Sequence, residues 1–245
     1  MTTVSRQRKG FTLIELLTVI AIIGVLAAVL FPGVQGVMRS AKKNSALNKL
    51  RSIGQGYMNW AQGGKVMVKT GTWVSGGAVA TKTSEYAANL AVGAALDSGE
   101  LWFVDGDAML EKNTIVLMPK NVIRVSGTTN IIDPAFTTAI TQGTGTSWTV
   151  YSGTSSGLVG SVAVPLAWTR GLNNAGSWPQ ADGTATGSVW GSEGGHIVYG
   201  DGHVSWVTDT LVTGRNYFTK TDGTPTANWL ESRSVPSTAI ALPQQ

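Results

Sequence analysis

The chain has 245 residues, of which 42% are hydrophobic and only 13% are charged, and it contains no cysteine. This length suits one globular domain together with an apolar segment. The absence of cysteine excludes a disulfide framework, a thiolate metal site and a cysteine nucleophile. The net charge of +4 comes from the N-terminal region, because residues 52–245 carry a net charge of −3. Nucleic-acid binding needs basic residues clustered on the folded body, so we expect no nucleic-acid partner.

An apolar run at residues 11–31 is long enough to cross the ~30 Å hydrocarbon core of a bilayer as a helix. Arg6, Arg8 and Lys9 precede this run. Because basic flanks stay in the cytoplasm, we expect a single-pass protein whose residues 32–245 lie outside the cytoplasm. A cleaved signal peptide is the alternative, but its apolar region usually has about 7–15 residues, which is shorter than this run.

A carboxylate, Glu15, interrupts the apolar run near its start. A charge in a membrane span is costly, so it is expected to have a partner and a function. The surrounding stretch Lys9–Leu17, KGFTLIELL, resembles the prepilin processing motif of type IV pilins and type II secretion pseudopilins. The resemblance implies that residues 1–10 are a leader, removed after Gly10 by a prepilin peptidase. It also implies that Phe11 becomes the N-methylated mature N-terminus.

The same resemblance implies a mechanical function in place of an enzymatic one. Glu15 would neutralise the Phe11 amine of a neighbouring subunit, and copies or related subunits would form a helical filament with the help of an inner-membrane assembly platform. The head would be periplasmic before assembly, and the filament would be periplasmic or on the cell surface. Gly24 and Pro32 both weaken a helix, and the resemblance implies that the segment between them loosens as subunits leave the bilayer.

A second pattern follows Pro32, in which apolar residues recur every three or four positions with basic residues between them. It predicts an amphipathic helix over residues 32–62, ended by Gly63 and Gly64. The basic residues have two interpretations. They are a phospholipid-facing or anion-binding stripe, or, more commonly, the solvated face of a half-buried helix.

The remainder, residues 63–245, is predicted to be a β-rich head. One helix is expected from Thr83 or Ser84, as the cap, to Leu96, with Gly99 as its stop. Gly- and Thr-rich stretches at 141–161 and 171–195 are expected to be surface loops. Short segments rich in β-branched and aromatic residues are predicted strands: Lys65–Lys69, Trp102–Val104, Thr114–Met118, Val122–Val125, Ser147–Tyr151, Val162–Trp168, His196–Tyr199 and His203–Val207. The predicted fold is α+β, with a long N-terminal helix packed on an antiparallel sheet.

The sequence Asp201-Gly202 between two alternating runs predicts a hairpin with a two-residue turn. In that register Ile197, Tyr199, Val204 and Trp206 share the core face. His196 and His203 would share one face but lie roughly 13 Å apart, too far to bind one ion. The Asp201-Gly202-His203 segment also resembles the DGHV element of a pseudopilin-like family, although the His expected ten positions earlier is Gly191 here.

Other candidate sites in the head are weaker. Asp105 and Asp107 supply oxygen atoms that suit Ca²⁺, but without EF-hand spacing; no other cofactor is expected. Gly153–Gly157 matches the nucleophile-elbow pattern without a following helix, so we expect no enzyme activity. Tryptophans near loops suggest an alternative function, a membrane-anchored module that stacks on carbohydrate or cell-wall polymer: Trp73, Trp148, Trp178, Trp190 and Trp229. Exposed, coplanar indoles would favour this alternative, whereas buried indoles would favour packing.

Overall fold

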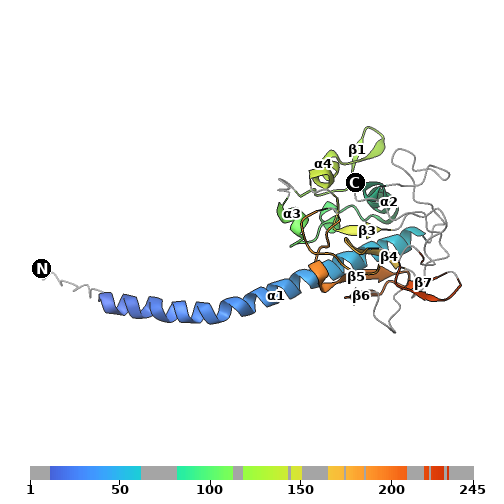
Figure 1. Ribbon diagram of the computed structural model, residues 1–245. Helices are drawn as coiled ribbons and strands as arrows, with labels where there is room; N and C mark the ends of the chain where they lie inside the picture. Colours follow the sequence, from blue (N-terminus) through green and yellow to red (C-terminus); the bar gives the residue numbers. More distant parts are fainter. Residues whose placement is uncertain are drawn as a thin grey trace, which may run out of the picture. The chain divides into compact units, whose positions relative to one another are not determined.

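The computed structural model describes residues 12–61, 82–112, 118–142, 145–150, 165–173, 175–184, 186–208, 218–220, 222–228 and 231. The chain divides into two compact units, residues 1–43 and 44–245. The first helix, α1 (Leu13–Ala61), runs through this division, and its two parts have different surroundings. The element order and the ribbon are shown in Figure 1.

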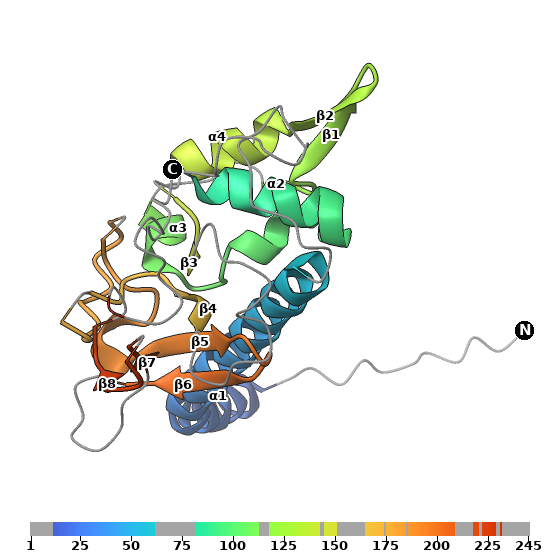
Figure 2. The same cartoon turned by 90° about the vertical axis from the view of Figure 1, so that its right-hand side faces the viewer.

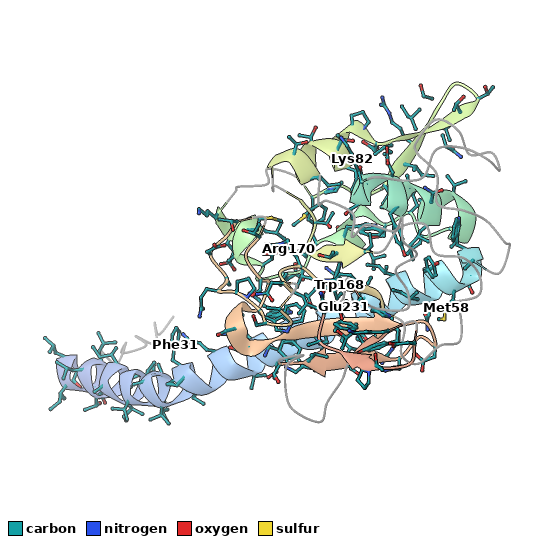
Figure 3. All side chains as sticks on the ribbon, turned by 45° about the vertical axis from the view of Figure 1, so that its right-hand side comes forward. Phe31, Met58, Lys82, Trp168, Arg170 and Glu231 are labelled. Atoms are coloured by element: carbon teal, nitrogen blue, oxygen red, sulfur yellow. The ribbon has the colours of Figure 1, made fainter. Side chains whose placement is uncertain are left out.

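The first part of α1, up to Met38, has its large apolar side chains exposed to solvent. Phe31, for example, is 68% exposed (Figure 3). Pro32 lies inside the helix, and α1 continues on both sides of it. Within the described residues, α1 is the helix whose length and composition would let it cross a membrane, and its apolar window is not buried by other parts of the chain. The prediction of a long apolar N-terminal helix is confirmed.

The second part of α1, from residue 44, is a core element of the head. Its inward stripe includes Leu50, Ile53, Tyr57 and Trp60, all buried. Their spacing of three and four residues places them on one helical face, as the amphipathic pattern predicts. Figure 2 shows strands β4 to β6 against this part of α1 and α2 on another side of it. The prediction of an α+β fold is confirmed.

The main sheet of the head has four antiparallel strands in the order β3-β4-β5-β6. They are β3 (Trp148–Val150), β4 (Pro165–Thr169), β5 (Gly195–Tyr199) and β6 (Val204–Val207). Every residue of β4 and β5 is buried, so the sheet is covered on both faces. One face packs against α1, where a Cβ on Gly54 would lie 2.5 Å from Cγ2 of Val198. The other face holds a second apolar cluster: Trp168, Leu172, Trp178, Ile197, Tyr199, Val207 and Phe218.

Two small hairpins and several short helices complete the head. The hairpins pair β1 (Ile123–Ser126) with β2 (Thr129–Ile132), and β7 (Phe218–Thr219) with β8 (Pro225–Thr226). The helices are α2 (Thr83–Ala94), α3 (Ala108–Lys112) and α4 (Pro134–Gln142), with single turns η1 (Gly99–Trp102) and η3 (Gly191–Glu193). The predicted strand Lys65–Lys69 and all of the predicted strand Thr114–Met118 except Met118 lie outside the described residues.

Some local predictions for the head were wrong. Trp102–Val104 is not a strand, because Trp102 is the last residue of η1 and Phe103 is the extended residue that caps this turn. Helix α2 is preceded by Lys82 and not capped by Thr83 or Ser84, and it ends at Ala95, which is left-handed with φ of 55°. The stretch predicted as a surface loop at 171–195 contributes buried residues to the core, among them Trp178 and Trp190.

The register of the hairpin between β5 and β6 also differs from the prediction by one residue. Val198 pairs with Val204 and His196 with Trp206. The Tyr199 N–H donates to the His203 carbonyl at 3.0 Å, so this pair closes a loop of three residues, 200–202. Gly202 in this loop is left-handed with φ of 87°, a common arrangement in hairpins. Because side chains alternate between faces, the shift separates the predicted core set: Val204 and Trp206 pack with the α1 cluster, whereas Ile197 and Tyr199 pack in the second cluster.

Candidate functional site

The start of α1 is closed by a reciprocal pair of side chains, Thr12 and Glu15. The Thr12 backbone N–H donates to Glu15 Oε2 at 2.9 Å, and the Thr12 hydroxyl donates to the same oxygen at 2.7 Å. In return, the Glu15 N–H donates to the Thr12 hydroxyl oxygen at 3.4 Å. This is a capping box, in which an N-cap Thr and an acidic residue three positions later satisfy backbone donors that the helix leaves open.

The capping box gives Glu15 a role within a single subunit that the sequence analysis missed. The signal was present as Thr12-Leu13-Ile14-Glu15 directly before an apolar run. A carboxylate in the first turn also interacts favourably with the positive end of the helix dipole. Glu15 is therefore positioned at the helix start by contacts within its own chain.

Of the other residues predicted to act in processing and assembly, the structure describes Gly24 and Pro32 but not Gly10 and Phe11. Gly10 and Phe11 lie outside the described residues, so their roles in cleavage and methylation stay predictions. Gly24 and Pro32 lie within α1, and a Cβ added at Gly24 would meet no atom within 4 Å. Close packing within the subunit therefore does not require a glycine there, and the predicted flexibility of the segment between Gly24 and Pro32 stays a prediction.

The predicted hairpin motif in the head forms a tightly connected turn. The His203 backbone N–H donates to Asp201 Oδ1 at 3.1 Å, and His203 Nδ1 lies 2.5 Å from the same oxygen. Burial opposes ionisation of Asp201, but these contacts with His203 outweigh it and lower the pKa of the carboxyl group. The ring of His203 stacks on Tyr199 with centroids 4.4 Å apart.

This turn rests on α1. A Cβ at Gly202 would lie 2.8 Å from Cε of Met58, which Figure 3 shows on α1. The Asp201-Gly202-His203 segment therefore connects the sheet to the helix. His196 contacts the ring of Trp206 instead, with centroids 4.8 Å apart. Because of the corrected register, His196 and His203 lie on opposite faces and not on the shared face that was predicted.

The two calcium candidates have different surroundings. Asp105 is exposed, and its Oδ2 lies 3.9 Å from Lys49 Nζ. Asp107 is fully buried and pairs with Arg170 at 2.5 Å. Its carboxylate also accepts hydrogen bonds from the Ser147 hydroxyl at 2.7 Å and from the Met109 N–H at 3.0 Å. Arg170 thus supplies the positive partner of Asp107, and calcium binding stays a prediction.

The buried pair also ties distant segments together, and sequence reasoning missed it. Arg170 Nη1 donates to the carbonyl oxygens of Thr184 and Gly187, both at 2.5 Å. The network therefore joins α3, β3, β4 and the loop before η3, near the centre of the head (Figure 3). No local sequence pattern pairs Asp107 with Arg170, because the two residues are 63 positions apart.

The described tryptophans of the alternative binding function are buried: Trp148, Trp178 and Trp190. Burial favours packing over stacking on a sugar. Trp73 and Trp229, as well as the Gly153–Gly157 segment, lie outside the described residues. Within the described part of the chain, no group of three or more acidic or histidine side chains is placed to hold a metal ion.

Comparison with known proteins assigns the N-terminal region to a class. Residues 5–31 match the prokaryotic N-terminal methylation motif. The chain is also similar to the fimbrial protein EcpB of Eikenella corrodens, with 52% identity over 46 residues, which are 19% of this chain and 29% of EcpB. The match therefore spans less than a third of that relative. No solved structure matches the chain.

Residues 5–31 thus carry the methylation motif, and this motif runs into an exposed apolar helix that is long enough to cross a membrane. The N-terminal region therefore resembles that of type IV pilin-like proteins, as the similarity to the fimbrial relative supports. The prediction of pilin-like kinship is confirmed for this region.

Proposed function

We propose that the chain is a structural subunit of a type IV pilus-like or type II secretion pseudopilus filament. The observation that carries this proposal is the position of Glu15, inside the methylation motif and at the first turn of a helix with an exposed apolar surface. An apolar surface of this extent needs lipid or other protein surfaces to cover it. The bilayer covers it in the precursor, and neighbouring helices cover it in the filament.

The proposed sequence of events begins in the inner membrane, with the N-terminus in the cytoplasm and the head in the periplasm. A prepilin peptidase cleaves between Gly10 and Phe11, and Phe11 is N-methylated. An assembly platform then moves the subunit from the bilayer into a filament of copies or related subunits. Loosening between Gly24 and Pro32 accompanies this transfer. Because these steps are mechanical for this chain, it acts without enzymatic activity of its own.

Glu15 has a separate role in this sequence of events. Near the cytoplasmic interface its carboxylate is held by Thr12 and is accessible to water. In a filament core, water is excluded, and an uncompensated carboxylate is strongly unfavourable. The amine of Phe11 on a neighbouring subunit supplies the compensating charge, so Glu15 acts in assembly and not in membrane insertion.

N-terminal analysis tests the proposal. Protein extracted from membranes of cells with an active prepilin peptidase is expected to begin at methylated Phe11, and protein from cells lacking the peptidase is expected to keep residues 1–10. Gly10→Val should block cleavage, whereas Gly24→Val, a matched change within the apolar run, should not. Recovery of only the full-length chain in the presence of active peptidase would refute processing. Absence of the processed chain from sheared filaments would refute the structural role.

A further inference from the structure

The uncharged part of α1 extends beyond the span predicted from the apolar run. No charged residue lies between Glu15 and Arg39. Val34, Val37 and Met38 are exposed, so the apolar surface continues past Phe31. At 1.5 Å per residue, the helix from residue 16 to residue 38 is about 35 Å long. This length crosses the ~30 Å hydrocarbon core with a moderate tilt.

The two ends of this uncharged run have complementary chemistry. Glu15 and Thr12 form the polar cap at one end, where the cytoplasmic interface is expected. Arg39, Lys42 and Lys43 follow directly at the other end. Spacings of three and four residues place these three side chains within one turn on neighbouring positions. If the cap lies at the inner interface, the three cations lie at the outer one.

The direction of helical side chains favours contact with the lipid. In an α-helix every Cα–Cβ bond tilts towards the N-terminus, which for α1 is the membrane side. Long basic side chains placed just beyond a span extend their charged ends into the headgroup layer. Arg39 is exposed, and Lys42 and Lys43 are half-buried.

The charge pattern differs from that of an ordinary solvated helix face. Such a face usually alternates acidic and basic residues at positions i and i+4. The part of α1 after Glu15 carries five basic residues and no Asp or Glu: Arg39, Lys42, Lys43, Lys49 and Arg51. Lys49 is directed to the head, where its Nζ donates to the Phe103 carbonyl at 2.8 Å. The cluster Arg39, Lys42 and Lys43 is the part nearest the apolar run.

We propose that Arg39, Lys42 and Lys43 bind the phosphate of anionic phospholipids in the outer leaflet of the inner membrane, and that the membrane span of the precursor reaches Met38. This inference rests on the membrane-anchored precursor of the proposed function, but it does not depend on filament formation. The cluster holds the subunit at a fixed depth until assembly. Leaving the bilayer then requires these contacts to break.

Lipid retention by the full-length chain tests the proposal. The chain is purified in mild detergent, incubated with an equimolar mixture of phosphatidylglycerol and phosphatidylcholine, and examined by native mass spectrometry. Wild type should retain phosphatidylglycerol preferentially. In the variant Arg39→Gln/Lys42→Gln/Lys43→Gln, this preference should fall by about fivefold or more, the factor for one basic residue near an anionic surface.

A matched control removes the same charge elsewhere. The variant Arg51→Gln/Lys120→Gln/Arg124→Gln loses three exposed cations and should keep the wild-type preference. Equal retention of both lipids by wild type, or an equal loss in both triple variants, would overturn the proposal. Undiminished lipid preference in the first variant together with reduced filament yield would overturn it in favour of contact with a neighbouring subunit. If the chain forms no filament but retains phosphatidylglycerol through the cluster, the proposed function fails and this inference stands.

Discussion

The two parts of α1 use apolar residues in opposite ways. Up to Met38 the apolar side chains surround the helix and remain exposed, whereas from Ala46 they form one stripe buried in the head. The apolar stripe of the second part is buried within the subunit, because the sheet and α2 pack on it. The apolar surface of the first part can be covered only by lipid or by protein surfaces outside the subunit. Substitutions in the first part of α1 should therefore change association with other chains or lipid. Substitutions in the second part should change the stability of the head.

The largest expected effect concerns the charge of Glu15. Glu15→Ala and Glu15→Gln should lower incorporation into filaments by about 100-fold or more, because each leaves a cationic N-terminus unpaired in a water-excluded core. Processed protein in the membrane should remain near the wild-type amount. The assay compares the chain in sheared filaments with the chain in membranes.

The capping box provides the control for that prediction. Gln can still cap a helix start, so Glu15→Gln removes the charge but keeps this function. Thr12→Ala does the reverse and should assemble nearly like wild type. Normal assembly of Glu15→Gln with failure of Thr12→Ala would show that capping, and not charge pairing, is the function of Glu15.

The second effect lies in the head. Asp107→Asn leaves Arg170 as a buried charge without its anionic partner, and we expect the free energy of unfolding to fall by about 3–5 kcal/mol. Near-UV circular dichroism of the full chain in mild detergent would measure this loss through the buried tryptophans. The exposed pair of Lys220 and Glu231, with side chains 40% and 44% exposed, provides the control. Glu231→Gln should cause a much smaller loss, and equal losses would contradict a central role for the buried pair.

A third test applies one substitution to both parts of α1. Gly54→Ala places a methyl group 2.5 Å from Cγ2 of Val198 and should destabilise the head by about 1–3 kcal/mol through overpacking. Gly24→Ala meets no atom within 4 Å and should leave unfolding of the head unchanged. Thermal unfolding of the two variants measures both effects. Equal destabilisation by both would show that the two parts of α1 are not energetically separate.

The smallest effect is the pH dependence of the hairpin turn. The pKa of Asp201 is lowered in the folded state, so its contribution to stability is present above the unfolded pKa of about 3.9 and is lost as pH falls through the folded pKa. Asp201→Asn should therefore be slightly less stable than wild type at pH 7, with the difference disappearing in acid. Asp105→Asn, which removes another exposed carboxylate of the head, is the control. A difference that grows below pH 4 would contradict the assignment.

The sequence predicted the elements with a clear local pattern and missed those with a weak one. The long helix follows from its apolar run and repeated apolar spacing, and strands β3 to β6 follow from short runs rich in β-branched and aromatic residues. Helix α4 was missed although Asp133 caps it, accepting the Ala135 N–H at 2.7 Å, and Pro134 occupies its first position. Its many threonines are poor helix formers, which obscured the Asp-Pro signal.

The candidate sites divide in the same way. Glu15 stands out in the sequence because it interrupts an apolar run, and its capping partner Thr12 was also readable from the spacing, whereas its role in assembly stays a prediction. The pairing of Asp107 with Arg170 was not predictable, because it depends on how α3 and β4 meet. The hairpin register was missed by one residue because Asp201-Gly202 is compatible with both two-residue and three-residue loops, and packing on Met58 distinguishes them.

The three-residue loop between β5 and β6 has a consequence for insertions and deletions. Val204 and Trp206 face α1 because Tyr199 pairs with His203 across the three-residue loop. Deleting Gly200 would leave Asp201 and Gly202 between the same pair, a length that suits a two-residue turn, so the strand register and both apolar clusters would be kept. Deleting Ser205 inside β6 would instead move Trp206 to the face of the second cluster. The head should therefore tolerate a one-residue deletion in this loop far better than one inside either strand.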